Sequence, residues 1–140
     1  MQKPTKSHLK VYFIGAGPGD LELLTLKALK VIRKADVIIY AGSLVNKDVL
    51  KFARKAAVRY DSAKMNLEEV LGIIEKEKST KKIIARLHTG DPSLYGAIQE
   101  QMDWCEKEKI DYEVIPGVSS FQAAAASLRQ EFTLPGLSQT

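Results

Sequence analysis

Three short segments combine glycine with proline, acidic or hydroxyl residues, a composition typical of loops that approach a ligand. The first reads Gly15-Ala16-Gly17-Pro18-Gly19-Asp20, the second spans residues 89–96, and the third spans residues 116–120. Glycine permits positive φ angles and close approach of the backbone to a bound molecule, and proline stiffens the loop before binding. The three segments are therefore the candidate ligand-binding loops of this chain.

The first loop differs from both common nucleotide-binding motifs. Its third glycine comes one residue too early for the dinucleotide motif G-x-G-x-x-G, and no Gly-Lys-Ser/Thr ending of a phosphate loop follows. Asp20 at its end would repel a pyrophosphate. Hydride transfer with a nicotinamide cofactor and nucleotide hydrolysis are therefore disfavoured, and a tight turn without a ligand stays open for this motif alone.

The second and third loops contain groups that either cap helices or bind a ligand. Asp91 is expected to cap the following helix through its backbone amides, or to accept hydrogen bonds from a ligand's hydroxyl or amino groups. Ser119 or Ser120 is expected to cap the alanine-rich helix that follows. His88 stands beside the second loop, and we interpret it as a structural hydrogen-bond partner rather than a proton shuttle.

Strand-like and helix-like patterns alternate along the chain and must position these loops. Apolar runs predict strands at residues 11–14, 37–40, 58–60, 82–87 and 112–115. Helical patterns follow at about residues 25–35, 46–55, 66–78, 93–107 and 119–128. Thr25 is expected to cap the first helix, and Asn66 with Glu69 to form a capping box. The alternation predicts an α/β fold with a mainly parallel sheet flanked by helices, in which all three loops follow strands at one edge.

Composition narrows the class of protein. The chain has 140 residues with a formal net charge of +4, 45% hydrophobic and 27% charged residues, which fits one globular domain and excludes a disordered chain. No apolar run is long enough to span a membrane and no signal pattern opens the chain, so a cytoplasmic protein without a membrane partner is expected. The single Cys105 and two distant histidines predict no disulfide and no metal site. The isoelectric point of about 9.1 agrees with an anionic small molecule as the binding partner, and no nucleic-acid partner is expected.

Four segments, read together, resemble the tetrapyrrole methylases. They are residues 11–20, 40–45, 86–96 and 116–120, and the resemblance spans residues 11–140. It implies methylation of a ring carbon by S-adenosylmethionine, although the same fold also serves diphthine synthase. Within the family, the segments are most similar to the branch that methylates carbon 11 of precorrin-4 or cobalt-precorrin-4 in cobalamin biosynthesis. Uroporphyrinogen methylases usually carry an acid where this chain has Ala41, so no general base is assigned there.

The resemblance also implies which residues bind the cofactor and the substrate. The implied S-adenosylmethionine contacts are Pro18, Thr89, Gly90, Asp91, Leu94, Ser119 and Ser120. The tetrapyrrole would lie over the first loop, at Gly17, Gly19 and Asp20. No metal ligand and no catalytic side chain is assigned.

Members of this family continue into a second domain, and this chain therefore resembles their N-terminal half. We expect an N-terminal arm at residues 1–10, an α/β domain at residues 11–130, and the start of a linker to an absent domain at residues 131–140. Such a half is expected to bind S-adenosylmethionine poorly and to turn over nothing, because half of the pocket is missing. A homodimer is expected, and the rival interpretation is a non-catalytic fragment that self-associates through the apolar surface left uncovered.

Overall fold

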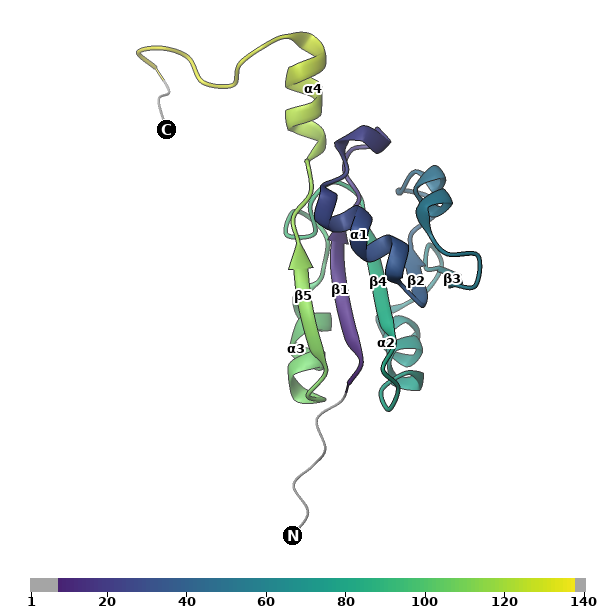
Figure 1. Ribbon diagram of the computed structural model, residues 1–140. Coiled ribbons are helices and arrows are strands. Elements are labelled where there is room, and N and C mark those ends of the chain that lie inside the picture. Colours follow the sequence, from purple (N-terminus) through teal and green to yellow (C-terminus); the bar gives the residue numbers. More distant parts are fainter. Residues whose placement is uncertain (1–7, 138–140) are drawn as a thin grey trace.

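The computed structural model describes residues 8–137, and its centre is one five-stranded sheet (Figure 1). The strands are β1 (Lys10–Gly15), β2 (Val37–Tyr40), β3 (Val58–Asp61), β4 (Ile83–His88) and β5 (Asp111–Ile115). Their order is β3-β2-β4-β1-β5, and every neighbouring pair is parallel. The expected parallel α/β fold is confirmed, and the carboxyl ends of all five strands lie at one edge.

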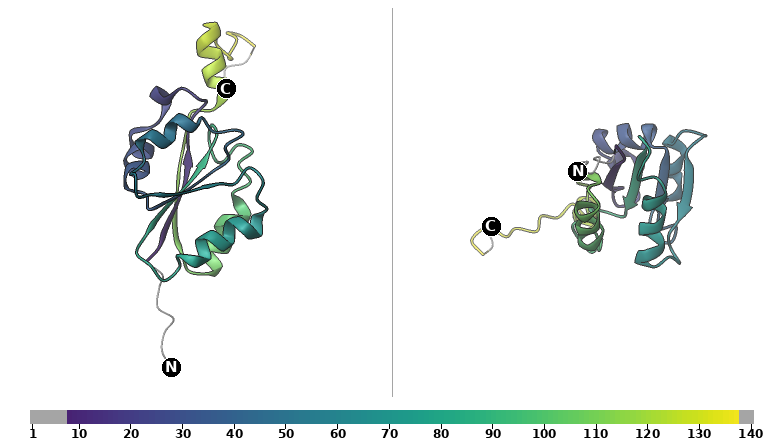
Figure 2. Two further views of the ribbon diagram at one scale, coloured as in Figure 1. Left: turned by 90° about the vertical axis from the view of Figure 1, so that its right-hand side faces the viewer. Right: turned by 90° about the horizontal axis from the view of Figure 1, so that it is seen from below.

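Helices cover both faces of this sheet (Figure 2). The helical elements are η1 (Leu21–Leu23), α1 (Leu26–Lys34), η2 (Lys47–Phe52), α2 (Leu67–Lys76), α3 (Gln99–Lys107) and α4 (Ser120–Leu128). The helices α1 and η2 lie on one face, and α2 and α3 lie on the other. Among the described residues, no helix is long and apolar enough to cross a membrane.

Alternating strand residues build a separate core on each face. Phe13 on β1 and Ile84 on β4 are fully buried in the core beneath α2 and α3, whereas Ile14 and Leu87 belong to the core beneath α1 and η2. Strand side chains alternate between faces, and a parallel sheet covered on both sides therefore needs apolar residues at nearly every position. The nearly continuous apolar runs in the sequence reflect this arrangement.

Hydrogen bonds confirm two of the predicted helix caps. Thr25 Oγ1 accepts from the Ala28 N–H at 3.1 Å at the start of α1. At the start of α2, Asn66 Oδ1 accepts from the Glu69 N–H at 2.9 Å, and the Asn66 N–H donates to Glu69 Oε2 at 3.0 Å. Each cap satisfies backbone N–H groups that have no partner inside the helix.

Two of the predicted helices differ from the structure. The helix expected at residues 46–55 is the shorter 3-10 helix η2, in which the Val49 N–H donates to Asn46 O at 3.1 Å. The Asn46 side chain also accepts from the Asp48 N–H, and such local bonds compete with α-helical pairing. The helix expected at residues 93–107 begins only at Gln99, because Tyr95 and Ala97 have φ angles of 60° and 50°, outside the helical region.

The two ends of the described chain differ in how they pack against the sheet. Leu9 is fully buried and Lys10 opens β1, although both lie within the range expected for the arm, residues 1–10. At the other end, α4 projects beyond the sheet and residues 129–137 lead away from it (Figure 1). Lys3 and Lys6 of the expected arm and residues 138–140 of the expected linker lie outside the described residues.

Candidate ligand-binding pocket at the carboxyl edge of the sheet

Backbone hydrogen bonds join the first loop to the second directly after β1 and β4. The Ala16 N–H donates to His88 O at 2.7 Å, and the Gly90 N–H donates to Gly17 O at 2.8 Å. The return bond, from the Gly17 N–H to Gly90 O, measures 3.3 Å. Gly17 and Gly90 have φ angles of 76° and 61°, a conformation that favours glycine. The two loops thus form a small antiparallel bridge at the edge of the sheet.

The third loop contacts both of the others through unusually close backbone approach. A Cβ atom placed on Gly15 would lie 2.6 Å from Gly117 Cα, from Gly117 N and from Gly90 O. Real Cβ atoms do not make contacts this short, so only glycine fits at residue 15 without movement of the backbone. The order β4-β1-β5 creates this meeting point, because β1 lies between the strands that lead into the second and third loops.

Asp91 ties the second loop to the third. Its Oδ2 accepts from the Gly117 N–H at 2.9 Å, and its Oδ1 accepts from the Ser93 N–H at 2.9 Å and from the Ser93 hydroxyl. The expected cap of the following helix is wrong, because α3 begins later, at Gln99. Partial burial raises the pKa of Asp91, but the hydrogen bonds from Ser93 and Gly117 outweigh it, so the net pKa is lowered. The carboxylate is therefore anionic at neutral pH and holds the loops together.

A pocket of about 570 Å³ opens where the loops meet. All seven residues implied as cofactor contacts line it, namely Pro18, Thr89, Gly90, Asp91, Leu94, Ser119 and Ser120. Ser119 is buried and is the N-cap residue of α4, and its N–H donates to Gln122 Oε1 at 3.0 Å. Ligand pockets of roughly 300–1,000 Å³ accommodate cofactor-sized molecules. The tertiary structure therefore brings sequence-distant candidates into one cavity of suitable size.

The three implied substrate contacts lie beside the pocket and not in its lining. Asp20 is exposed, and its Oδ1 accepts from the Glu22 N–H at 2.9 Å to cap η1. Gly19 O accepts from Asn46 Nδ2 at 2.7 Å, which attaches the first loop to the start of η2. Gly17 is occupied by the bridge to Gly90. Pro18 is the member of this loop that reaches the pocket.

Several residues of the pocket lining were not assigned as ligand contacts from the sequence. These are Ala41, Leu44 and Val45 after β2, Arg86, Leu87 and His88 on β4, Tyr95 and Gly96 in the second loop, and Phe121 on α4. Tyr95 is fully exposed and lies at a positive φ of 60°. The sequence contained a signal for Arg86 and His88. Residues two apart on a strand lie on the same face, so both are expected on one face at the end of β4.

Burial controls the electrostatics of Arg86 and His88. Desolvation by burial lowers the pKa of Arg86 to about 10, and its Nη1 donates to Ser62 Oγ at 2.9 Å. Burial, together with the nearby Arg86 charge, lowers the pKa of His88 to about 3, so its imidazole is neutral at physiological pH. His88 packs against Phe13, with ring centroids 6.3 Å apart. The pocket lining therefore contains a cation close to a neutral imidazole.

Cys105 and Trp104 on α3 pack in the core beneath α2 and α3. Cys105 is fully buried on α3, and burial raises the pKa of its thiol to about 11, which agrees with a packing role. Trp104 packs against the same core. Within residues 8–137, no group of three or more His, Cys, Asp or Glu side chains is arranged to hold a metal ion.

Known proteins are similar to this chain in sequence and in fold. The family model for tetrapyrrole (corrin/porphyrin) methylases matches residues 10–140. Cobalt-precorrin-4 C(11)-methyltransferase of Methanocaldococcus jannaschii is 58% identical over 131 residues, which cover 94% of this chain and 51% of the relative. The chain therefore spans about half the length of the curated relatives it matches.

Solved structures show the same relationship. A cobalamin biosynthetic enzyme, cobalt precorrin-4 methyltransferase, superposes with a TM-score of 0.91 at 46% identity, covering 99% of this chain and 58% of that one. Uroporphyrin-III C-methyl transferase from Thermus thermophilus, complexed with S-adenyl homocysteine, superposes with a TM-score of 0.75 at 32% identity, covering 91% of this chain and 51% of that one. The chain belongs to the tetrapyrrole (corrin/porphyrin) methylase family.

Proposed function

We propose that the protein to which this chain belongs transfers a methyl group from S-adenosylmethionine to ring carbon 11 of cobalt-precorrin-4 or precorrin-4, in cobalamin biosynthesis. One observation carries the proposal: seven residues implied as cofactor contacts, drawn from three separate loops, line a single pocket. The choice of branch rests on the 58% identity to a cobalt-precorrin-4 C(11)-methyltransferase. Another tetrapyrrole methylase, or diphthine synthase, is the alternative within the same fold.

The pocket has the donors, acceptors and apolar surface that an adenosyl cofactor requires. Thr89 and Ser120 offer hydroxyl groups, and the loop backbone around Gly90 offers polar groups close to the cavity. Leu44, Val45 and Leu94 provide apolar contact for a flat base. These residue types fit S-adenosylmethionine, and we assign the seven lining residues named above as its contacts.

The proposed chemistry needs positioning more than side-chain reactivity. S-adenosylmethionine supplies a methyl group that is already electrophilic, because it is attached to a positively charged sulfur. The residues of the chain would hold donor and acceptor within an attack distance of roughly 3–3.5 Å and exclude water from the site. The tetrapyrrole would lie over the first loop, at Gly17, Gly19 and Asp20. No residue of this chain is assigned as a nucleophile or as a general base.

Because the chain spans about half the length of its relatives, we expect the isolated chain to bind the cofactor weakly and to catalyse no methyl transfer. A homodimer and a cytoplasmic location stay predictions from the sequence. The structure adds one observation in favour of the rival, self-associating fragment: Leu128, Phe132 and Leu137 near the end of the chain expose 70%, 62% and 84% of their surface.

Titration of the ¹⁵N-labelled chain with S-adenosylhomocysteine tests the cofactor pocket, since NMR detects weak binding. We expect amide shifts at Gly90, Ser119 and Ser120. Leu94→Glu should weaken binding about tenfold, because it removes one apolar contact from the pocket lining. Leu128→Glu is the matched control, because Leu128 is also exposed and does not line the pocket.

Two results would contradict the proposed pocket. One is a set of amide shifts confined to α2 and α3, no residue of which lines the pocket. The other is equal weakening of binding by Leu94→Glu and Leu128→Glu. Methyl transfer to precorrin-4, measured with a chain continued to the length of the relatives, tests the choice of substrate against the other methylases.

A further inference from the structure

Two buried nitrogen atoms of residues that line the pocket have no hydrogen-bond partner in the part of the chain that the structure describes. They are Nε of Arg86 and Nε2 of His88. Both side chains belong to β4 and line the pocket. A buried donor or acceptor without a partner costs free energy, more so on a charged group, so such groups are uncommon in native proteins and call for an explanation.

The charge of Arg86 also lacks an anionic partner. None of the ion pairs among residues 8–137 includes Arg86, and its hydrogen bond goes to the neutral hydroxyl of Ser62. Asp61, which precedes Ser62 in the chain, already accepts with its Oδ1 from the Gly42 N–H at 2.9 Å and the Ala63 N–H at 3.0 Å. A mostly buried guanidinium without a carboxylate is costly unless a ligand supplies the opposite charge.

The charges of the pocket lining favour the binding of one anion. The carboxylate of Asp91 is engaged by Ser93 and Gly117, and His88 is neutral because burial and the Arg86 charge lower its pKa to about 3. The Arg86 guanidinium is then the one formal positive charge in the lining. Guanidinium groups bind carboxylates strongly, since their N–H groups match carboxylate geometry and both partners are charged.

We propose that Arg86 binds a carboxylate of the pocket's ligand through its Nε–H, with His88 as a second donor in its Nε2–H tautomer. This inference rests on the proposed function, because both proposed ligands carry carboxylates. The carboxylate belongs either to the methionyl part of the cofactor or to a side chain of the tetrapyrrole. In both cases Arg86 is a binding and orienting residue, and it takes no part in bond making.

The Nε–H resonance of Arg86 in the ¹⁵N-labelled chain reports directly on this contact and is assigned by its loss in Arg86→Lys. Three probes distinguish the sources of the carboxylate. S-adenosylhomocysteine carries the methionyl carboxylate, 5′-methylthioadenosine has the same nucleoside and thioether without it, and uroporphyrin carries tetrapyrrole carboxylates. A shift with S-adenosylhomocysteine and not with 5′-methylthioadenosine assigns the cofactor carboxylate. A shift with uroporphyrin alone assigns the substrate carboxylate.

Failure of this inference and failure of the proposed pocket give different NMR results. If the probes shift the amides of Gly90 and Ser119 while the Arg86 Nε–H resonance stays in place, this inference is wrong and the proposed pocket survives, with water as the partner of Arg86. If none of the three probes shifts the pocket amides, both proposals are overturned for this chain.

A variant pair supplies an independent readout. Arg86→Met should weaken binding of the carboxylate-bearing probe about tenfold, while affinity for 5′-methylthioadenosine stays within about twofold. Arg59→Met on β3 is the matched control, since Arg59 is exposed and does not line the pocket. Unfolding curves establish whether both variants fold. If Arg86→Met does not fold, Arg86→Lys replaces it, because lysine keeps the positive charge but lacks the paired N–H donors of a guanidinium. Equal effects of the Arg86 and Arg59 substitutions would overturn the inference.

Discussion

At the scale of single residues, burial gives β4 its unusual chemistry. Arg86 and His88 carry side chains that prefer water, yet both lie at the carboxyl end of a central strand between β2 and β1. Burial lowers both pKa values, which keeps His88 neutral and leaves Arg86 as a desolvated cation. This combination favours a ligand that brings one negative charge and accepts hydrogen bonds.

The lowered pKa of His88 predicts a loss of stability in acid. The unfolded chain takes up a proton near pH 6.5, whereas the folded chain resists protonation until about pH 3. Stability therefore falls as the pH drops through this window, by about 2 kcal/mol at about pH 5 from this group. Urea unfolding at about pH 7 and about pH 5 should show a smaller decrease in the free energy of unfolding for His88→Gln than for the unsubstituted chain.

His8→Gln, at an exposed position, is the control and should behave as the unsubstituted chain does. Equal acid losses in all three chains would contradict the assignment.

At the scale of elements, glycine sets the distance between the three loops. Gly15 at the end of β1 packs against Gly117 and Gly90 without space for a side chain. This contact brings the ends of β4, β1 and β5 together and allows Asp91 to reach the Gly117 N–H. The pocket therefore depends on backbone packing as much as on the side chains that line it.

Gly15→Ala is expected to lower the free energy of unfolding by about 3 kcal/mol, because the new methyl group overlaps backbone atoms that cannot turn away. Gly72→Ala is the matched control, since Gly72 lies in α2 with open space around it. The control should gain about 0.5–1 kcal/mol, the usual difference between glycine and alanine in a helix. Urea unfolding of both variants checks the pair, and a harmless Gly15→Ala would show that the loops do not meet as described.

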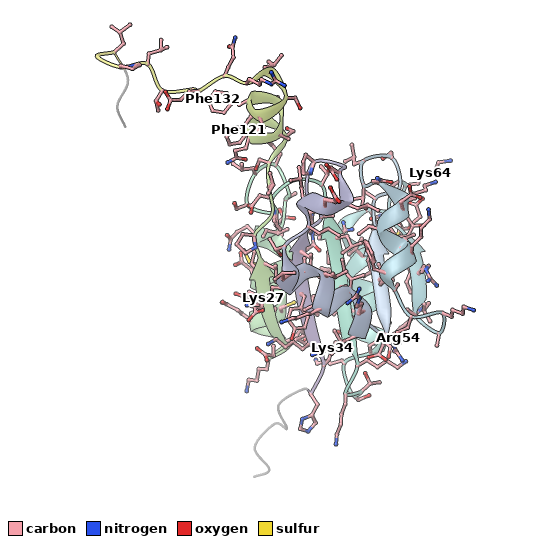
Figure 3. All side chains as sticks on the ribbon, turned by 45° about the horizontal axis from the view of Figure 1, so that its top comes forward. Lys27, Lys34, Arg54, Lys64, Phe121 and Phe132 are labelled. Carbon is pink, nitrogen blue, oxygen red and sulfur yellow. The ribbon has the colours of Figure 1, made fainter. Side chains whose placement is uncertain are left out.

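At the scale of the whole molecule, α4 and the residues after it are unlike the rest. Figure 3 shows Phe121 and Phe132 close together beyond the sheet, and their ring centroids are 5.8 Å apart. None of the residues of α4 is buried, although five of its nine are alanine or phenylalanine. In contrast, the basic side chains Lys27 and Arg54 on the sheet body are paired with Glu113 and Asp36. Apolar surface of this kind favours contact with another protein surface.

The isolated chain is therefore expected to self-associate, with an average mass that rises above 15.5 kDa as concentration increases. The double variant Leu128→Lys/Phe132→Lys should stay closer to the monomer mass, because it places charge on the apolar surface. Leu26→Lys/Val58→Lys is the matched control, since Leu26 and Val58 are exposed by 75% and 48% on the sheet body. Sedimentation equilibrium measures the masses. A monomer at all concentrations, or equal effects of the two pairs, would contradict a role for α4 and the following residues.

Local patterns in the sequence were enough to predict much of the fold. The apolar runs located all five strands to within a residue or two, and the caps at Thr25 and Asn66 are confirmed. The start of α3 was wrong because Tyr95 and Ala97 adopt positive φ angles, which nothing in their residue types demands. Seven candidate residues line one pocket, whereas Arg86 was not singled out and His88 was interpreted as a structural hydrogen-bond partner, because the surroundings of both side chains depend on strands distant in sequence.

What the sequence determined by itself is the order of strands, helices and glycine-containing loops, since hydrogen bonding within helices, capping and apolar periodicity act between near neighbours along the chain. Only the tertiary structure decided that β1 lies between β4 and β5, because strand pairing joins residues such as Gly15 and His88 that are far apart in sequence. That pairing brings the three loops together and places Arg86 and His88 in the lining of the pocket.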